Sequence, residues 1–227
     1  NTRTIMINIA LVDDHNLFRT SLAAWLNNNE KLHVALECEN GKELQLFLPK
    51  HEIDVVLLDI QMPEMDGIET CEWLTRTYPG IKILIVSFLK DVDVIYQMMQ
   101  RGAHGYFSKE AAPEELAQAI QSLDYTSFFF NHSIRHIIQE AKKWKPAKKE
   151  KNTTTTAIHD QFFTQRETEI LKWVSQGLKS AEIGDKMSID VRTVETHRRN
   201  IIEKTPAKNM IGAVLWAFKE GWIELEG

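Results

Sequence analysis

Three features are scarce or absent in this sequence, and each absence excludes a class of protein. Only two of its 227 residues are cysteines, Cys38 and Cys71, and neither belongs to a CxxC pair or a Cys/His cluster. This count disfavours a disulfide framework or a zinc site, and we expect reduced, partly buried thiols. No apolar run approaches the roughly 20 residues that cross a bilayer. The apolar N-terminal run ends in two acids and has no small-residue cleavage site, which favours a first strand over a signal peptide. We expect a cytoplasmic protein without a membrane partner.

Positive charge is scarce in the first half of the chain. The net charge is -5, but residues 1–124 carry 10 lysines and arginines against 19 acids, whereas residues 161–227 carry 10 of each. The first segment is therefore a poor binder of nucleic acid, and only the rest of the chain could meet phosphates.

Residues 1–124 alternate between two periodicities. Amphipathic helical stripes separate five short β-rich runs, at 6–12, 32–38, 53–59, 81–87 and 103–108. Such alternation predicts an α/β fold, a doubly wound five-stranded parallel sheet with helices on both faces. The functional crevice of such a sheet lies at the carboxyl ends of its strands.

The rest of the chain is read as an extension, a linker and a second domain. We expect residues 125–145 to be helical and residues 146–160, with four consecutive threonines and several lysines, to be a flexible linker. Residues 162–227 have helical periodicity, with a capping box at Thr164 and Glu167, a stop at Gly177 and a turn at 188–190. The predicted domains are 1–124, an extension and linker at 125–160, and a small all-α domain at 161–227.

Polar side chains stand where the predicted strands end. Asp13 and Asp14 close the first strand, Asp59 the third and Ser87 the fourth, and Lys109 follows the fifth. In a parallel sheet these five side chains converge at one edge. The repulsion among three carboxylates is relieved by a hard cation such as Mg²⁺, and an Asp carboxylate can attack a phosphoryl group. The metal, the ammonium and the hydroxyl would bind the phosphoryl oxygens.

Residues 5–124 resemble a receiver domain of two-component response regulators, which has a flavodoxin-like fold. The matching stretches are LVDDHNLFR, DVVLLDIQMPEMDGIE, ILIVSF and GAHGYFSK. The resemblance implies that Asp59 is the phosphoacceptor and that Tyr106 is an aromatic switch. It also implies that Ser87 and Lys109 contact the phosphoryl group. The Mg²⁺ site would consist of Asp14 bound directly, Asp13 bound mainly through water, Asp59 and the backbone carbonyl of Gln61.

Phe88 departs from this family's pattern, which usually has a smaller residue after the position of Ser87. A bulky ring there would restrict access to an acyl phosphate and change its rate of formation or loss.

A predicted helix from about Val191 to Lys204 has one apolar and one polar face. At about 100° per residue, Val194, His197 and Ile201 share the packing face. The opposite face is free, and its arginines, threonine and glutamate could read bases in a major groove, while two further cations suit phosphates. The candidate DNA-contacting residues are Arg192, Thr193, Glu195, Thr196, Arg198, Arg199 and Lys204.

The stretch from FTQRETEIL to HRRNIIEK resembles the helix-turn-helix of NarL/LuxR-type regulators, including its Thr-Val-x-x-His core. Glu195 stands where the family commonly has Lys, so the family's base preference cannot be transferred to this chain. Together, the two resemblances imply a DNA-binding response regulator controlled by phosphorylation of Asp59. Its partners would be a sensor histidine kinase, double-stranded DNA and a second copy of the chain. The receiver would catalyse only its own phosphotransfer and phosphate loss.

Two alternatives remain at this point. The first is a phosphohydrolase that uses Asp59 as nucleophile, but Gln61 offers no general acid two residues on. The second is a protein-interaction adaptor without DNA binding, which the free face with Arg192, Thr196 and Arg199 disfavours.

The final predicted helix offers a surface for pairing. Its apolar residues follow an i, i+3/i+4 pattern, and a domain of about 65 residues has limited interior to bury them all. They are Met210, Ile211, Val214, Leu215 and Phe218, with Trp216 and Trp222 nearby. We hypothesise that the unphosphorylated receiver hinders the C-terminal domain, and that phosphorylation repositions Ser87 and Tyr106 and releases it.

Overall fold

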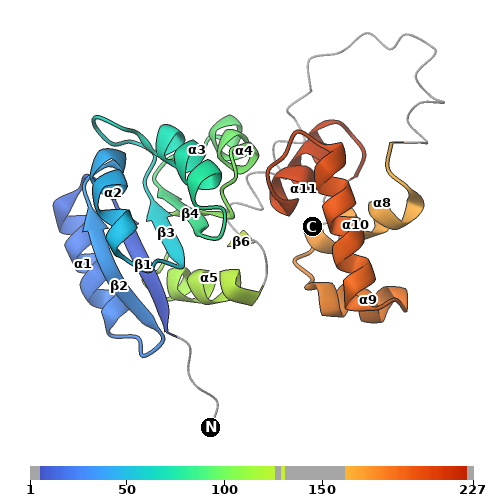
Figure 1. The fold of residues 1–227 in the computed structure, drawn as a ribbon, viewed down its shortest axis with the longest axis horizontal. Helices are drawn as coiled ribbons and strands as arrows, with labels where there is room; N and C mark the ends of the chain where they lie inside the picture. The colour runs from blue at the N-terminus through green and yellow to red at the C-terminus, as the bar shows by residue number, and fades with distance from the viewer. Residues whose placement is uncertain (1–5, 126–128, 131–161, 224–227) are drawn as a thin grey trace.

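The computed structural model describes residues 6–125, 129–130 and 162–223. A sheet with strand order β2-β1-β3-β4-β5-β6 forms the first domain, and four helices form the second (Figure 1). The strands are β1 (Ile7–Val12), β2 (Leu32–Cys38), β3 (Val55–Leu58), β4 (Lys82–Ser87), β5 (Gly105–Ser108) and β6 (Phe129–Phe130). The helices of the first domain are α1 (Asn16–Asn27), α2 (Gly41–Phe47), the 3₁₀ turn η1 (Leu48–Lys50), α3 (Gly67–Thr77), α4 (Val92–Gln100) and α5 (Pro113–Tyr125).

Strand alternation divides the first domain into two cores. Leu57 and Leu84 point to the face covered by α1 and α5, where Leu26 and Ile120 pack on them. Their strand neighbours, such as Val56, point to the opposite face, covered by α2, α3 and α4. All strand pairs are parallel. The predicted doubly wound α/β fold is confirmed.

One element differs from the sequence prediction. We predicted that residues 125–145 continue as helix, but Phe129–Phe130 forms strand β6, paired in parallel with β5. Aromatic residues favour strands, and β5 would otherwise be an unpaired sheet edge. The sheet therefore has a sixth, short strand. Residues 126–128, 131–145 and the predicted linker at 146–160 lie outside the described residues.

The second domain comprises α8 (Gln165–Ser175), α9 (Ser180–Met187), α10 (Val191–Lys204) and α11 (Met210–Lys219). Its boundaries follow the local signals. The capping box joins Thr164 and Glu167, Gly177 has a positive φ of 88° after α8, and Ser188 ends α9 in the left-handed conformation.

The two cysteines are reduced and buried, as the sequence predicted. Cys38 and Cys71 are both free and buried, and burial raises each thiol's pKa to about 12, so neither is a reactive thiolate. Among the described residues, no helix is long and apolar enough to span a membrane.

Candidate functional site

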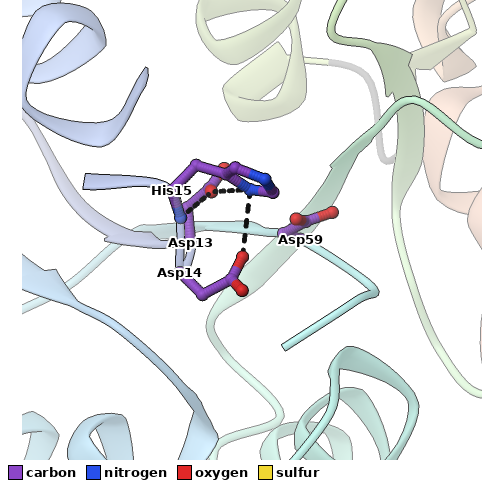
Figure 2. A group of neighbouring side chains, drawn as sticks. All are labelled: Asp13, Asp14, His15 and Asp59. Carbon is purple, nitrogen blue, oxygen red and sulfur yellow. Dashed lines mark hydrogen bonds and ion pairs between the residues drawn. The ribbon is translucent and has the colours of Figure 1, made fainter. Parts of the chain in front are cut away.

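The strand order brings the predicted acidic residues together. Strands β1 and β3 are neighbours, so Asp13 and Asp59, which follow them directly, lie side by side. Asp14 and His15 complete a group at the same sheet edge (Figure 2). Lys109 arrives from beyond β5, because its backbone N–H donates to the Ser87 carbonyl at 3.0 Å and extends the strand pairing by one residue.

A buried ammonium stands between two buried carboxylates. The side chains of Asp13, Asp59 and Lys109 are 2%, 4% and 1% exposed, and Lys109 Nζ lies 2.7 Å from an oxygen of each acid. Burial raises the pKa of Asp59, and the hydrogen bond and charge of Lys109 oppose that rise. The other Asp59 oxygen accepts from the Ile60 N–H at 2.7 Å. This arrangement holds the Asp59 carboxylate in one orientation, as a nucleophile requires.

The loop after Asp59 is closed tightly by a glycine. The Gly67 N–H donates to the Ile60 carbonyl at 2.9 Å. A Cβ at Gly67 would lie 2.1 Å from the Asp59 carbonyl oxygen, so no other residue fits without moving the backbone of the central acid.

The same acids form a donor set for a metal ion. One ligand atom from each of Asp13, Asp14, His15 and Asp59 lies within 4.8 Å of all the others. Cis and trans ligands of a hard octahedral cation at 2.0–2.1 Å would lie about 3 and 4 Å apart, so ligand atoms up to 4.8 Å apart would have to draw slightly closer to share one such ion. Asp14 is exposed and could reach it from the solvent side. The three carboxylates outnumber the single ammonium, which favours a divalent cation.

Ser87 and Tyr106 lie between this edge and α4. Both are fully buried. Ser87 Oγ accepts from the Leu89 N–H at 3.3 Å, and the Tyr106 hydroxyl donates to the Leu89 carbonyl at 2.9 Å. Burial raises the pKa of Tyr106 to about 12, so its hydroxyl stays a donor at neutral pH. The β4–α4 loop therefore connects the predicted phosphoryl contact with the predicted switch residue.

Two aromatic rings flank the ammonium. Lys109 Nζ lies 4.8 Å from the ring centroid of Phe18 and 5.4 Å from that of Phe88, which is half-exposed. Phe88 thus lies close to the site, as we predicted from the sequence, whereas the position of Phe18 was not predicted.

Arg19 was also missed. It is buried, and its guanidinium donates to the Asp13 carbonyl and to Glu39. The available signal was its place on α1 three and seven residues before the core residues Leu22 and Leu26, which marks the buried side of that helix.

Helix α10 presents a polar face to solvent. Val194 and Ile201 are buried and His197 is partly buried, as the periodicity predicted. Of the candidate DNA-contacting residues, five are exposed: Arg192, Glu195, Thr196, Arg199 and Lys204. The Thr193 hydroxyl instead donates to the capping carboxylate of Asp190 at 3.0 Å.

Two cations that we assigned to phosphates have partners within the domain. Arg198 is buried, and its guanidinium donates to the Ser180 hydroxyl and lies 3.4 Å from Glu195. Lys204 Nζ lies 2.6 Å from the carboxylate of Glu167, whose side chain is 3% exposed. Burial alone would raise the pKa of Glu167, but the hydrogen bonds from Lys204 and Thr164 outweigh it and lower the pKa. These contacts give Arg198 and Lys204 a role in the stability of the domain, and their contact with phosphates stays a prediction.

This assignment predicts a stability effect for Lys204→Met. Removing the ammonium leaves the Glu167 carboxylate buried with one partner fewer, so the free energy of unfolding should fall by about 1–3 kcal/mol. Urea denaturation of the full chain measures it, with exposed Lys208→Met as the matched control. If the Lys204→Met protein is as stable as the wild type but binds all DNA sequences more weakly, Lys204 contacts phosphates and does not stabilise the domain.

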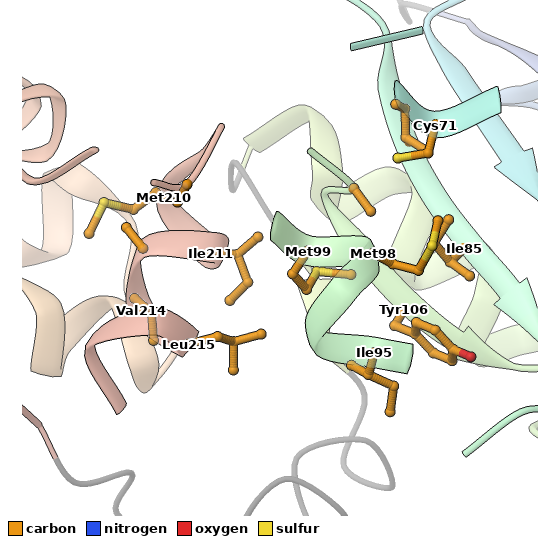
Figure 3. Packing of buried hydrophobic residues seen from close by; sticks show 14 of the residues in the cluster. Cys71, Ile85, Ile95, Met98, Met99, Tyr106, Met210, Ile211, Val214 and Leu215 are labelled. Atoms are coloured by element: carbon orange, nitrogen blue, oxygen red, sulfur yellow. The ribbon is translucent and has the colours of Figure 1, made fainter. Parts of the chain in front are cut away.

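Helix α11 packs against α4 of the first domain. Ile211 and Leu215 point toward Met99 of α4 (Figure 3). The opposite side of helix α4 packs on Tyr106. A Cβ at Gly212 would already lie 2.9 Å from the Met99 carbonyl oxygen, so the two helices are in close contact there. The apolar surface that we predicted for pairing is therefore partly covered by the first domain.

Hydrogen bonds and a cation–π contact also join the two domains at the α4–α11 interface. The Asn209 side chain donates to the Gly102 and Ala103 carbonyls at 3.0 and 2.8 Å, while its oxygen caps α11. Gln100 donates to the Gly212 carbonyl at 2.8 Å. The Lys219 ammonium lies 4.2 Å from the Tyr96 ring centroid.

Two family models match separate parts of the chain. The first, described as "Response regulator receiver domain", matches residues 9–121. The second, described as "Bacterial regulatory proteins, luxR family", matches residues 161–217.

Curated proteins match over nearly the whole length. The chain is 26% identical over 226 residues to the transcriptional regulatory protein DegU of Brevibacillus brevis, covering 96% of each. It is 29% identical over 222 residues to the response regulator GacA of Pseudomonas aeruginosa, covering 96% of this chain and 99% of that one. RcsB from Salmonella enterica serovar Typhimurium, solved bound to a promoter with a phosphomimetic, has a similar fold. Its TM-score is 0.57 at 20% identity, over 94% of this chain and 98% of that one.

Proposed function

The chain belongs to the response regulators that join a receiver domain to a LuxR-type helix-turn-helix, and we propose that phosphorylation of Asp59 controls its activity as a DNA-binding transcription regulator. The observation that carries the proposal is the buried Asp59 carboxylate, held by Lys109 at the carboxyl edge of a parallel sheet. The same chain displays two arginines on the exposed face of α10.

Phosphoryl transfer to Asp59 would depend mainly on positioning the reacting groups and neutralising their charge. A sensor histidine kinase would supply the phosphoryl group, and the Asp59 oxygen would attack the phosphorus as the histidine nitrogen leaves. Lys109 and Ser87 would contact the phosphoryl oxygens. Asp13, Asp14, Asp59 and the Gln61 carbonyl would hold Mg²⁺, which neutralises charge on the transferring group. The receiver would act only on itself and not on an outside substrate.

The route from Asp59 to DNA passes through α4. Tyr106 packs on the inner side of α4, and α11 packs on its outer side (Figure 3). In this arrangement the polar face of α10 stays exposed, so the receiver does not cover the proposed DNA-reading surface. The receiver domain instead covers part of α11. We infer that phosphorylation moves the β4–α4 loop through Ser87 and Tyr106 and frees α11, which then pairs with a second copy on adjacent half-sites. Such a regulator works where the chromosome is, in the cytoplasm.

The full chain, treated with acetyl phosphate and Mg²⁺, tests this function. We expect its intact mass to rise by one phosphoryl group and its capture of genomic DNA fragments to become selective. A phosphorylated chain that enriches no fragment over random DNA would refute the transcription-regulator function.

The contact between α4 and α11 predicts the behaviour of Asn209→Asp. Aspartate still caps α11, because its carboxylate accepts from the Gly212 N–H. It cannot donate to the Gly102 and Ala103 carbonyls, and its charge faces them. The unphosphorylated variant should therefore dimerise and bind its DNA site more tightly than the unphosphorylated wild type, approaching the affinity of the phosphorylated protein. Sedimentation and footprinting measure this.

Asn28→Asp introduces the same charge at an exposed position beyond α1 and is the matched control. If Asn209→Asp leaves both the oligomeric state and the DNA affinity of the unphosphorylated chain unchanged, the α4–α11 contact does not restrain the protein.

A further inference from the structure

Glu195 is an acid in the middle of a surface proposed to bind a polyanion. It lies on the exposed face of α10 between Arg192 and Arg199, and its side chain is 52% exposed. A free carboxylate there would repel phosphates and weaken binding to every DNA sequence. The contacts that Glu195 makes indicate a more specific role.

One oxygen of the Glu195 carboxylate is held by two side chains of the same domain, Ser180 and Arg198. Oε1 accepts from the hydroxyl of Ser180, the first residue of α9, and lies 3.4 Å from Arg198 NH1. The same guanidinium nitrogen donates to Ser180 Oγ, so the three side chains form a closed cycle. The Arg198 side chain is only 8% exposed, so its charge lies under the surface. Within the described residues, no hydrogen bond to Glu195 Oε2 is seen.

The cycle changes the chemistry of the acid in two ways. The buried guanidinium offsets the carboxylate charge at close range, which reduces the repulsion of phosphates. Fixing Oε1 also removes rotamer freedom before any ligand binds, so less entropy is lost when Oε2 forms a contact. The result is one oriented acceptor, with no donor, on the exposed face of a helix.

We propose that Glu195 Oε2 selects cytosine at one position of the DNA site by accepting from its N4 amino group, and that Arg198 and Ser180 are positioning residues for that contact. The inference rests on the proposed DNA-binding function. In the major groove guanine presents two acceptors and thymine an acceptor and a methyl group, all of which a carboxylate disfavours. Adenine places an acceptor, N7, beside its amino group. Cytosine presents a donor alone.

Selection of binding sites by the phosphorylated full chain from a randomised duplex library tests the proposal. The wild-type motif should contain one position where cytosine is preferred about tenfold, the size of one well-placed contact. Glu195→Ala should lose the preference at that position and keep the rest of the motif. Glu195→Lys should prefer guanine there, because an ammonium donates to O6 and N7.

Variants of Ser180 test the positioning. Ser180→Ala should weaken the cytosine preference without changing the other positions, and Ser180→Thr, which keeps the hydroxyl, should restore it. A merely structural role would not change one base position alone. Glu203→Ala removes the same charge near the C-terminal end of α10, away from the end that reads bases, and should leave the motif intact.

The outcomes separate the inference from the function on which it rests. If the wild type enriches a motif that Glu195→Ala reproduces at every position, Glu195 reads no base and the inference is overturned. If Glu195→Ala lowers the preference at all positions equally, the acid is structural and the inference is overturned as well. If the wild type enriches no motif, sequence-specific DNA binding itself is refuted.

Discussion

Asp59→Asn protein incubated with acetyl phosphate and Mg²⁺ will gain no mass, whereas the wild type will gain one phosphoryl group. The amide has no nucleophilic oxyanion and cannot form an acyl phosphate. Its size is nearly that of the acid, so the buried position between Ile60 and Lys109 stays filled. Intact-mass spectrometry gives the result directly. Chelation of the divalent cation should abolish the wild-type gain too, because three carboxylates would then face the incoming phosphoryl group with only Lys109 to offset them.

The control for that experiment is Asp93→Asn, an exposed acid in the first turn of α4. It removes the same charge from the same domain and should label like the wild type. Labelling of Asp59→Asn at the wild-type level would place the acceptor on another residue and remove the basis for the receiver chemistry assigned here.

Arg192→Ala and Arg199→Ala will each weaken binding to the cognate DNA site by about 1–3 kcal/mol, or about 5- to 150-fold. Both guanidiniums are exposed on the face of α10 that the domain leaves free, and an arginine paired with guanine makes two hydrogen bonds that a wrong base cannot replace. Competition binding on cognate and random duplexes at fixed salt measures the loss. The loss of binding free energy should be much smaller on random DNA, because there each substitution removes only the attraction between the arginine charge and the phosphates.

Arg166→Ala is the matched control, since it removes an exposed arginine from α8, outside α10. Equal losses on cognate and random DNA for Arg192→Ala and Arg199→Ala would mean that these arginines contact phosphates only. Base reading by α10 would then be contradicted.

The sequence predicted the acidic edge well for a topological reason. When all strands are parallel, their carboxyl ends meet at one edge, so the position of Asp13, Asp59 and Lys109 after a strand suffices to bring them together. The sixth strand was not predicted, because its existence depends on pairing with β5 and not on its own pattern. Local periodicity carries no information on such a distant partner.

The cations of α10 show a similar limit. Helical geometry places Lys204 on the same side as the packing residue His197, which was a usable sign that it faces the domain. Its partner Glu167 lies 37 residues away in sequence, so the ion pair itself is visible only in the fold. The apolar excess of α11 indicated correctly that a cover was needed, but no pattern said that α4 of the same chain provides it.

The hydrogen bonds between the two domains have a consequence for how these domains can change over evolutionary time. Their acceptors are main-chain carbonyls, at Gly102 and Ala103 for Asn209 and at Gly212 for Gln100. A main-chain carbonyl is present whatever side chain its residue carries, so substitutions there do not delete an acceptor. The donors of these three hydrogen bonds, in contrast, are the side chains of Asn209 and Gln100. Chimaeras that exchange receivers between relatives should therefore keep this contact when residues 100 and 209 keep their amides, even where the rest of the exchanged surface differs.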